Sequence, residues 1–224
     1  MIAAQGSRPY VTLKLATSLD GRIAAANGES RWITGAEARA AVHAMRAAHD
    51  AIIVGIGTAL ADDPELTVRT DPAPQKQPAR VVIDSQCRLR PDSKLARSAH
   101  EGRVIVYVTA TSASEKRASL SEAGVDVRII AGAVGKVDLA EALADMQGAG
   151  FHRVLIEGGG QLAAALIETG LVDRLEWMRA PIVLGAGGVP AVAALEDQRL
   201  SAAPRWRRVE VRVIGDDLWE SYEI

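Results

Sequence analysis

The stretch that most restricts the fold runs from Val154 to Ile167 and reads VLIEGGGQLAAALI. An apolar run ends at Glu157, three glycines follow, and a run rich in alanine and leucine comes next. This pattern predicts a buried strand, a turn of bare backbone and the start of a helix. The first N–H groups of a helix and its dipole suit a phosphate. A turn that needs glycine only for packing fits the same pattern.

Glu157 stands at the predicted carboxyl end of its strand, where open α/β sheets bind their ligands. The run also matches G-x-G-x-x-A from Gly158 to Ala163, a pattern found in Rossmann domains. We do not expect a Rossmann domain, because Glu176 lies inside the next predicted strand instead of at its end. The sequence therefore favours a nucleotide phosphate at this turn in a different α/β fold.

The size and charge of the chain exclude several classes of function. Its 224 residues suit one large domain, and we expect a single domain over 1–224 with residues 1–8 as a loose lead-in. The 26 Lys and Arg residues against 28 Asp and Glu residues give a net charge of −2, so nucleic acid is not the expected partner. No membrane association is expected either, because the longest apolar run, 51–61, is shorter than the roughly 20 residues of a membrane helix.

Cysteine and histidine usage argues against a disulfide framework and against a metal site. Cys87 is the single cysteine, and the four histidines show no H-E-x-x-H spacing. The N-terminal residues lack the apolar core of a signal peptide. We therefore expect a cytoplasmic protein without a metal ion.

Strand and helix patterns alternate along most of the chain. Strands are predicted at 10–16, 51–56, 80–84, 104–108, 125–131 and 154–157, and helices at 34–49, 114–123, 138–147 and after the glycines. Residues 57–64 are predicted as a loop, 66–69 as extended chain and 70–79 as a surface loop. After residue 174, strands at 175–179, 182–184, 206–214 and 218–223 follow one another without helices. The fold class is therefore α/β, with a mixed, mostly parallel sheet, helices on both faces and antiparallel C-terminal strands.

Three polar or aromatic positions allow two interpretations each. Asp62 and Asp63 precede a proline, which is typical of a turn, yet they follow a central strand, where acids donate protons or hold ligands. Lys14 alternates with Leu13 and Leu15, which favours an outward side chain over one that points into a site. Trp32 lies in a polar loop and either covers the core or stacks on a flat ligand.

Five blocks of sequence occur in one order and span nearly the whole chain. They are 9–24, 28–34, 57–58 with 61–69, 82–85, and 157–160, the last reading EGGG. Together they resemble the reductase domain of riboflavin biosynthesis, which has a dihydrofolate-reductase-like fold and is commonly fused behind a zinc-dependent deaminase. With only Cys87 available for zinc, we expect this chain not to deaminate.

The resemblance implies that NADPH reduces a small phosphoribosyl pyrimidine, 5-amino-6-(5-phosphoribosylamino)uracil, to its ribityl form. The family also includes standalone reductases that act on the undeaminated 2,5-diamino-pyrimidinone, and the sequence leaves this choice open. It further implies a homodimer, and a separate deaminase as a further partner. Other readings are a reductase of a pterin-like substrate on the same fold, or a noncatalytic nucleotide-binding partner of a deaminase.

The resemblance also assigns site residues, position by position. Ser30, Arg46, Leu66, Arg69 and Glu157 match the substrate site, where two guanidiniums suit a phosphate dianion. Ala16, Trp32, Thr58, Asp62, Ser85, Gly158, Gly159, Gly160, Gln161 and Leu162 match the NADPH site. We nominate Asp62 as proton donor, because it has a like-charged neighbour, and Lys14 and Glu157 as the groups that orient the ribose. Arg88 is the predicted partner of the cofactor's 2′-phosphate.

Overall fold

The computed structural model describes residues 7–132, 135–197 and 199–224, which form two compact units. Unit 1 contains Arg46–Val154 and the described residues before Val11, and unit 2 contains Val11–Met45 and Leu155–Ile224. The boundaries fall inside strand β1 (Tyr10–Thr17), helix α1 (Ala36–Ala47) and strand β7 (Arg153–Glu157). Most of the predicted lead-in, residues 1–6, lies outside the described residues.

Unit 1 is built on four parallel strands in the order β3-β4-β5-β6. The strands are β3 (Ala51–Gly55), β4 (Ala79–Ile83), β5 (Val104–Val108) and β6 (Asp126–Ile129). The helices are α2 (Ile56–Asp62), α3 (Lys94–Arg97), α4 (Ser114–Glu122) and α5 (Leu139–Gly148). β3, β4 and β5 are mostly buried because helices cover both faces of the sheet, as parallel sheets require, whereas the edge strand β6 has no fully buried residue.

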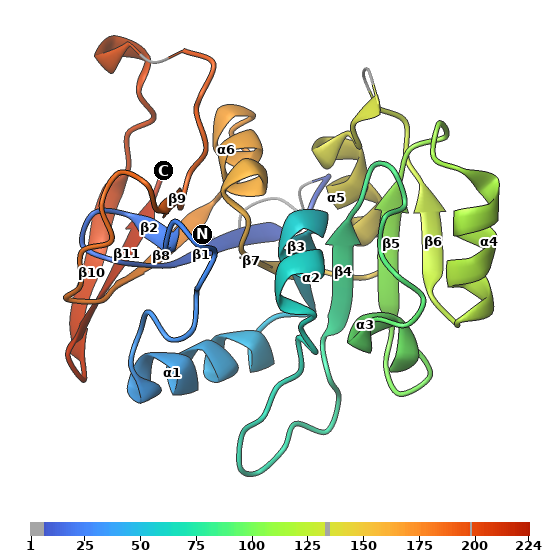
Figure 1. Cartoon of the computed structure of the whole chain (residues 1–224), viewed down its shortest axis with the longest axis horizontal. Coiled ribbons are helices and arrows are strands. Elements are labelled where there is room, and N and C mark those ends of the chain that lie inside the picture. The colour runs from blue at the N-terminus through green and yellow to red at the C-terminus, as the bar shows by residue number, and fades with distance from the viewer. Residues whose placement is uncertain (1–6, 133–134, 198) are drawn as a thin grey trace. The chain divides into compact units, whose positions relative to one another are not determined.

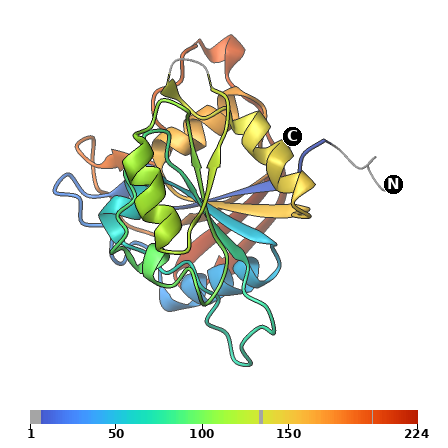
Figure 2. The same ribbon diagram turned by 90° about the vertical axis from the view of Figure 1, so that its right-hand side faces the viewer.

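Successive residues of β5 serve the two faces of unit 1. Val106 and Val108 pack in one cluster with Leu95 of α3 and Leu120 of α4. Tyr107, between them in sequence, is fully buried and donates its hydroxyl to Asp145 of α5 at 2.6 Å. Figures 1 and 2 show α4 and α5 on opposite sides of β5 and β6. The alternation of side chains along a strand explains this arrangement.

Unit 2 has a mixed set of strands in the order β10-β11-β8-β1-β7. β1 and β8 (Arg174–Arg179) are parallel, whereas β11 (Asp217–Glu223) is antiparallel to both β8 and β10 (Arg207–Ile214). A separate ribbon joins β2 (Arg22–Ala24) to β9 (Val189–Pro190). α6 (Gly160–Glu168) and a short 3₁₀ turn, η2 (Leu200–Ala202), complete the unit.

Helix α1 covers one face of the unit 2 strands with the apolar stripe that its sequence predicts. Ala38 and Val42 are buried against Met178 of β8, and Met45 packs at the edge of this cluster. α6 lies on the other face (Figure 1). The helix begins at Ala36, two residues later than predicted, and the N–H of Gly35 donates to Asp217 Oδ2 at 2.7 Å.

Three local predictions are wrong. Residues 56–62 form α2 instead of a loop, because Gly57 lies in the first turn and Pro64 follows the left-handed C-cap Asp63, so neither interrupts the helix. Residues 66–69 form no strand, and Leu66 has a φ of 53°. Residues 182–184 also form no strand. Turn residues misled the prediction in the first case, and apolar composition in the other two.

The predicted α/β fold class is confirmed: the strands of unit 1 are parallel with helices on both faces, and unit 2 has a mixed set whose C-terminal strands are antiparallel. None of the helices in the described ranges is long and apolar enough to cross a membrane.

Candidate functional site

A buried acid and a partly buried base meet on two neighbouring strands of unit 2. Glu157 ends β7, and its Oε2 lies 3.9 Å from Nζ of Lys14 on β1. The two side chains are only 7% and 15% exposed. The outward interpretation of Lys14 is therefore wrong, because its ammonium turns toward an acid instead of toward solvent. Charges this buried interact more strongly than a surface pair.

A second acid stands beside Lys14 in the sheet. Glu176 of β8 is the register partner of Lys14, and it is 5% exposed. Its carboxylate accepts hydrogen bonds from Arg174, Trp219 and Ser221. Sequence reasoning used Glu176 only to reject a Rossmann domain. A charged residue inside an apolar strand was the available signal that it has a specific environment.

The glycine turn after Glu157 uses its three glycines in two ways. Gly158 and Gly159 have φ values of 102° and 92°, a conformation that side chains disfavour. At Gly160, a Cβ would lie 2.5 Å from the carbonyl oxygen of Pro190, so this glycine is needed for packing. α6 begins here, and no side chain caps its first N–H groups. The packing interpretation is therefore confirmed at Gly160, and phosphate binding at the turn stays a prediction.

The remaining predicted residues of unit 2 lie on β1 and on the segment before α1. Ala16 borders the cluster under α1, and Ser30 is half-buried. Trp32 is 69% exposed, and the guanidinium carbon of Arg39 lies 4.4 Å from its ring centroid. Gln161 is exposed and Leu162 is buried in the first turn of α6. Trp32 therefore does not cover the core.

In unit 1, α2 carries Thr58 and ends at Asp62, both half-buried. The adjacent acids have different environments, because Asp63 Oδ1 accepts the backbone N–H of Lys94 at 2.9 Å. Asp63 thereby joins α2 to the start of α3. This contact gives Asp63 a structural role and leaves Asp62 as the candidate for chemistry.

The predicted phosphate-binding residues of unit 1 lie near the end of α1 and in the segment after α2. Arg46 donates to the carbonyl oxygen of Thr67 at 2.9 Å, which fixes its guanidinium next to the segment that holds Leu66. Leu66 is 4% exposed. Arg69 is exposed and forms an ion pair of 3.1 Å with Glu65. An exposed pair of this kind contributes little to stability, so Arg69 is available for an anionic ligand.

The loop after β4 holds Ser85 and is organised by Asp84. Asp84 Oδ2 accepts the N–H groups of Arg88 and Leu89 at 2.6 and 2.8 Å. Burial raises the pKa of the Asp84 carboxyl, and the N–H donors oppose that rise. Ser85 Oγ accepts the N–H of Val137 at 3.0 Å. Asp84 therefore shapes the loop that presents Ser85.

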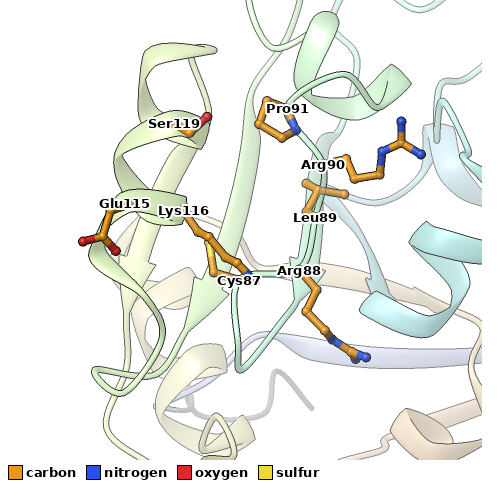
Figure 3. A pocket seen from close by; sticks show the side chains of 8 residues that line it. All are labelled: Cys87, Arg88, Leu89, Arg90, Pro91, Glu115, Lys116 and Ser119. Atoms are coloured by element: carbon orange, nitrogen blue, oxygen red, sulfur yellow. The ribbon is translucent and has the colours of Figure 1, made fainter.

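A pocket of about 420 Å³ opens beside this loop (Figure 3). It is lined by Cys87, Arg88, Leu89, Arg90, Pro91, Glu115, Lys116 and Ser119. Lys116 extends from α4 toward the backbone at Cys87 and Arg88, while Arg90 points away and is held by Asp92. Burial raises the pKa of the Cys87 thiol. Apolar walls with cationic groups at the rim suit a base that carries a phosphate.

The predicted site residues fall in both units. Unit 1 holds Arg46, Thr58, Asp62, Leu66, Arg69 and Ser85, and unit 2 holds Lys14, Ala16, Ser30, Trp32, Glu157 and 158–162. Among the residues that the structure describes, no group of three or more His, Cys, Asp or Glu side chains is arranged to hold a metal ion.

Comparison with known proteins gives matches along almost the whole chain. Riboflavin biosynthesis protein RibD of Actinobacillus pleuropneumoniae is 35% identical over 221 residues, which cover 98% of this chain and 58% of that protein. The 2,5-diamino-6-ribosylamino-4(3H)-pyrimidinone 5′-phosphate reductase of Methanothermobacter thermautotrophicus is also 35% identical, with 97% of this chain and 99% of that protein covered. The chain thus spans little more than half of one relative and nearly all of the other.

Solved structures and a family model agree with these matches. Acinetobacter baumannii RibD superposes with a TM-score of 0.83 at 31% identity, over 97% of this chain and 58% of that one. Dihydrofolate reductase of Enterococcus faecalis, at 14% identity and a TM-score of 0.51 over 96% of this chain and 95% of that one, shares the fold, so the predicted dihydrofolate-reductase-like fold is confirmed. The family model described as the RibD C-terminal domain matches residues 9–219. The chain belongs to the RibD C-terminal domain family.

Proposed function

We propose that the chain reduces 5-amino-6-(5-phosphoribosylamino)uracil to its ribityl form with NADPH, as a step of riboflavin biosynthesis. The observation that carries the proposal is the buried Lys14–Glu157 pair directly before a bare glycine turn and the open start of α6. Family membership supports it, since named relatives are RibD proteins and a pyrimidinone phosphate reductase.

The undeaminated pyrimidine is the second candidate substrate. It is favoured by the Methanothermobacter relative, whose name specifies a 2,5-diamino pyrimidinone and whose whole length this chain matches. The test is NADPH oxidation, followed at the absorbance band of the reduced cofactor, with each purified pyrimidine ribosyl phosphate in parallel. Turnover of the deaminated compound alone supports the first candidate, and preference for the other supports the second. Absence of turnover with both contradicts the proposed function.

In the proposed mechanism, Lys14 and Glu157 hold the ribose hydroxyls while the sugar ring opens. Opening moves a proton to the ring oxygen and leaves an imine between C1 and the exocyclic nitrogen. NADPH supplies the hydride that C1 accepts, and the nitrogen takes up a proton. Asp62, the last residue of α2, is the proposed donor of that proton. Full turnover by Asp62→Asn would remove Asp62 from this role.

The phosphate of the substrate is proposed to bind Ser30, Arg46 and Arg69, with Leu66 beside it. Arg46 is already positioned by the carbonyl oxygen of Thr67, and Arg69 has to exchange Glu65 for the phosphate. Charge-assisted bonds of this kind contribute about 1.5–3 kcal/mol. Arg69→Ala should therefore raise the KM for substrate by roughly tenfold to a hundredfold with little change in the KM for NADPH. A substrate KM equal to that of wild type would exclude Arg69.

Two features, each within its own unit, suit parts of the cofactor: the glycine turn of unit 2 suits the pyrophosphate, and the pocket beside β4 in unit 1 suits a base that carries a phosphate. Positive φ values at Gly158 and Gly159 keep side chains out of the approach to α6, which suits the pyrophosphate. Ala16, Trp32, Thr58, Asp62, Ser85, Gly160, Gln161 and Leu162 complete the proposed cofactor site. Arg88 and Lys116 supply positive charge for a 2′-phosphate, which distinguishes NADPH from NADH.

Cofactor choice is tested by comparing Arg88→Ala with Arg90→Ala. Arg88→Ala should raise the KM for NADPH about tenfold and leave the KM for NADH unchanged, as expected for loss of one charge-assisted contact. Arg90→Ala is the matched control, because Arg90 is bound to Asp92. Equal preference ratios in Arg88→Ala and wild type would exclude the 2′-phosphate role of Arg88.

We propose that the two units act together as one reductase domain, and that the chain forms a homodimer. β10 is the last strand in the order of unit 2, and Val211 and Val213 on it are 47% and 79% exposed. Sedimentation equilibrium of wild type and Val213→Glu tests the dimer; a monomeric wild type would contradict it. A separate deaminase partner and a cytoplasmic location remain predictions.

A further inference from the structure

Two arginine–tryptophan stacks occur in unit 2, and their surroundings differ. Arg212 lies over Trp219 at 4.2 Å, and Trp219 also packs against the cluster beneath α1. Arg39 lies over Trp32 at 4.4 Å, and Trp32 is 69% exposed. Trp219 thus contributes to the apolar core of unit 2. The second presents most of its surface to solvent while a cation covers one face.

Arg39 is held in place independently of Trp32. Its Nη1 donates to the carbonyl oxygen of Thr34 at 2.8 Å, and its backbone N–H donates to the carbonyl oxygen of Gly35 at 3.2 Å. Arg39 stands in the first turns of α1, whose buried Ala38 and Val42 anchor the helix. The guanidinium is therefore a fixed support, and the indole that rests on it is a platform with one open face.

A flat ring is the ligand that an open indole face binds best. Such a platform, already held by Arg39, loses little freedom when a ring stacks on it. Trp32 belongs to the proposed cofactor site, and the planar rings of that cofactor are adenine and nicotinamide. Ser30, two residues earlier, is proposed to contact the substrate, which places the reacting nicotinamide end nearer to this segment.

We infer that Arg39 is a positioning residue that acts through Trp32 and makes the platform favour the reduced, uncharged nicotinamide over the oxidised, cationic one. The inference rests on the proposed function, because it takes Trp32 as part of the cofactor site. The indole ring attracts cations, and Arg39 already forms a cation–π contact with one of its faces. A second cation on the opposite face is then repelled by the first, whereas a neutral dihydronicotinamide is not.

The expected size of this discrimination follows from the stacking geometry. A ring in van der Waals contact with the open face would lie roughly 8 Å from the guanidinium, since the contact adds about 3.5 Å to the existing separation. Coulomb repulsion at that distance changes affinity by about twofold in the dielectric of water and by about thirtyfold in the effective dielectric near a protein surface. The protein therefore binds the product NADP⁺ more weakly than NADPH by a factor in this range, which favours product release.

The test measures dissociation constants of NADPH and NADP⁺ for three variants by calorimetry, with product inhibition constants as the kinetic counterpart. Arg39→Met removes the charge and keeps an apolar stem, so NADP⁺ should bind about twofold to thirtyfold more tightly relative to NADPH. Arg39→Lys keeps the charge and should restore the wild-type ratio. Arg212→Met removes the other stack and should leave the ratio unchanged.

A structural role of Arg39 alone would shift both dissociation constants by the same factor, and that result would overturn the inference. A ratio in Arg39→Lys equal to that in Arg39→Met would also overturn it, because charge would then not be the cause. If the wild-type protein binds and oxidises NADPH but Arg39→Met leaves the ratio of the NADP⁺ and NADPH dissociation constants unchanged, this inference is rejected. The proposed function would still stand. Wild-type protein that does not bind NADPH rejects both.

Fluorescence identifies which end of the cofactor reaches Trp32. The signal of Trp32 is the difference between wild type and Trp32→Phe, because the chain contains four tryptophans. Quenching by NADP⁺ but not by adenosine 2′,5′-bisphosphate, which lacks nicotinamide, is expected. Equal quenching by both would place adenine on the platform and overturn the inference.

Discussion

Strands β4 and β7 present the same sequence pattern, an apolar run that leads to an acid, yet the two acids have different partners. Asp84 follows β4, is fully buried, and accepts two N–H groups from its own loop. Glu157 ends β7, has a side chain that is 7% exposed, and lies beside Lys14 of the neighbouring strand. The residues that follow decide the outcome, because ordinary residues after Asp84 fold back on it, whereas Gly158 and Gly159 turn the backbone with positive φ. An acid at a strand end thus indicates a site only together with its turn.

The largest effect in this comparison is expected for Glu157→Gln. The substitution preserves shape but removes the charge that faces Lys14, so kcat/KM should fall roughly a hundredfold or more, within the range for groups that act on protons or orient reactants. The melting temperature should also fall, because the largely buried Lys14 ammonium loses the charge of Glu157. The measurement is the initial rate of NADPH oxidation together with a melting curve. Asp84→Asn is the control, and equal losses of turnover in both variants would break the comparison.

Asp84→Ala should cause the largest loss of stability. Two buried N–H groups lose a charged acceptor, which costs about 2–4 kcal/mol of unfolding free energy. Asp84→Asn should lose less, because one amide oxygen replaces Oδ2 for both N–H donors, and Oδ1 has no partner in the described part of the chain. Urea unfolding of the two variants checks this order. Similar losses in both would mean that the charge, and not the acceptor geometry, holds the loop.

Comparison of wild type with Asp84→Asn should show how the free energy of unfolding depends on pH, with a definite sign. Burial raises the folded-state pKa of Asp84, so the folded protein binds its proton more tightly than the unfolded chain does. Stability should therefore fall as pH rises from the ordinary carboxyl pKa through the raised one, and the contribution should level off above it. Asp84→Asn should lack this component when unfolding is compared at roughly pH 4 and pH 8. A slope of opposite sign that Asp84→Asn abolishes would contradict the raised pKa.

Gly159→Ala tests the contribution of the glycine turn that follows β7. Gly159→Ala forces a side chain into a φ of 92°, which should cost about 1–2 kcal/mol and raise the KM for NADPH. Gly170→Ala is the matched control at the other end of α6, with a φ of 65° and nothing within 4 Å of its Cβ position. It should reduce stability without affecting the KM. A raised KM in both variants would assign the effect to α6 as a whole.

Sequence patterns predicted most elements, because apolar periodicity reports directly on buried faces. The Val154–Ile167 run and the helices predicted at 34–49 and 138–147 all lie at or within two residues of the predicted positions. α2 was missed because a seven-residue helix between Gly55 and Asp63 carries turn residues at both ends. Its apolar positions are too few to show a period.

The surroundings of a candidate site residue could not be predicted where a distant segment of the chain decides them. The interpretation of Lys14 as outward failed because alternation along β1 says nothing about Glu157 on β7 or Glu176 on β8. The stack of Arg39 on Trp32 depends on how the loop before α1 turns back over the helix, which composition does not encode. The different roles of Asp62 and Asp63 depend on Lys94, 31 residues beyond Asp63.

The smallest effect, that of Ser85→Ala, tests whether the loop after β4 also contacts the cofactor. Ser85 Oγ accepts the N–H of Val137, a buried residue, so its loss should cost about 1 kcal/mol. Ser93→Ala removes the hydroxyl that caps α3 in the same unit and should cost a similar amount. If Ser85 also donates to the cofactor, only Ser85→Ala should raise the KM for NADPH, by a few-fold. Equal KM values in the two variants would limit Ser85 to shaping the loop. The segment after β4 would then lack the ligand contact proposed for the turn after β7, in addition to the different partners of Asp84 and Glu157.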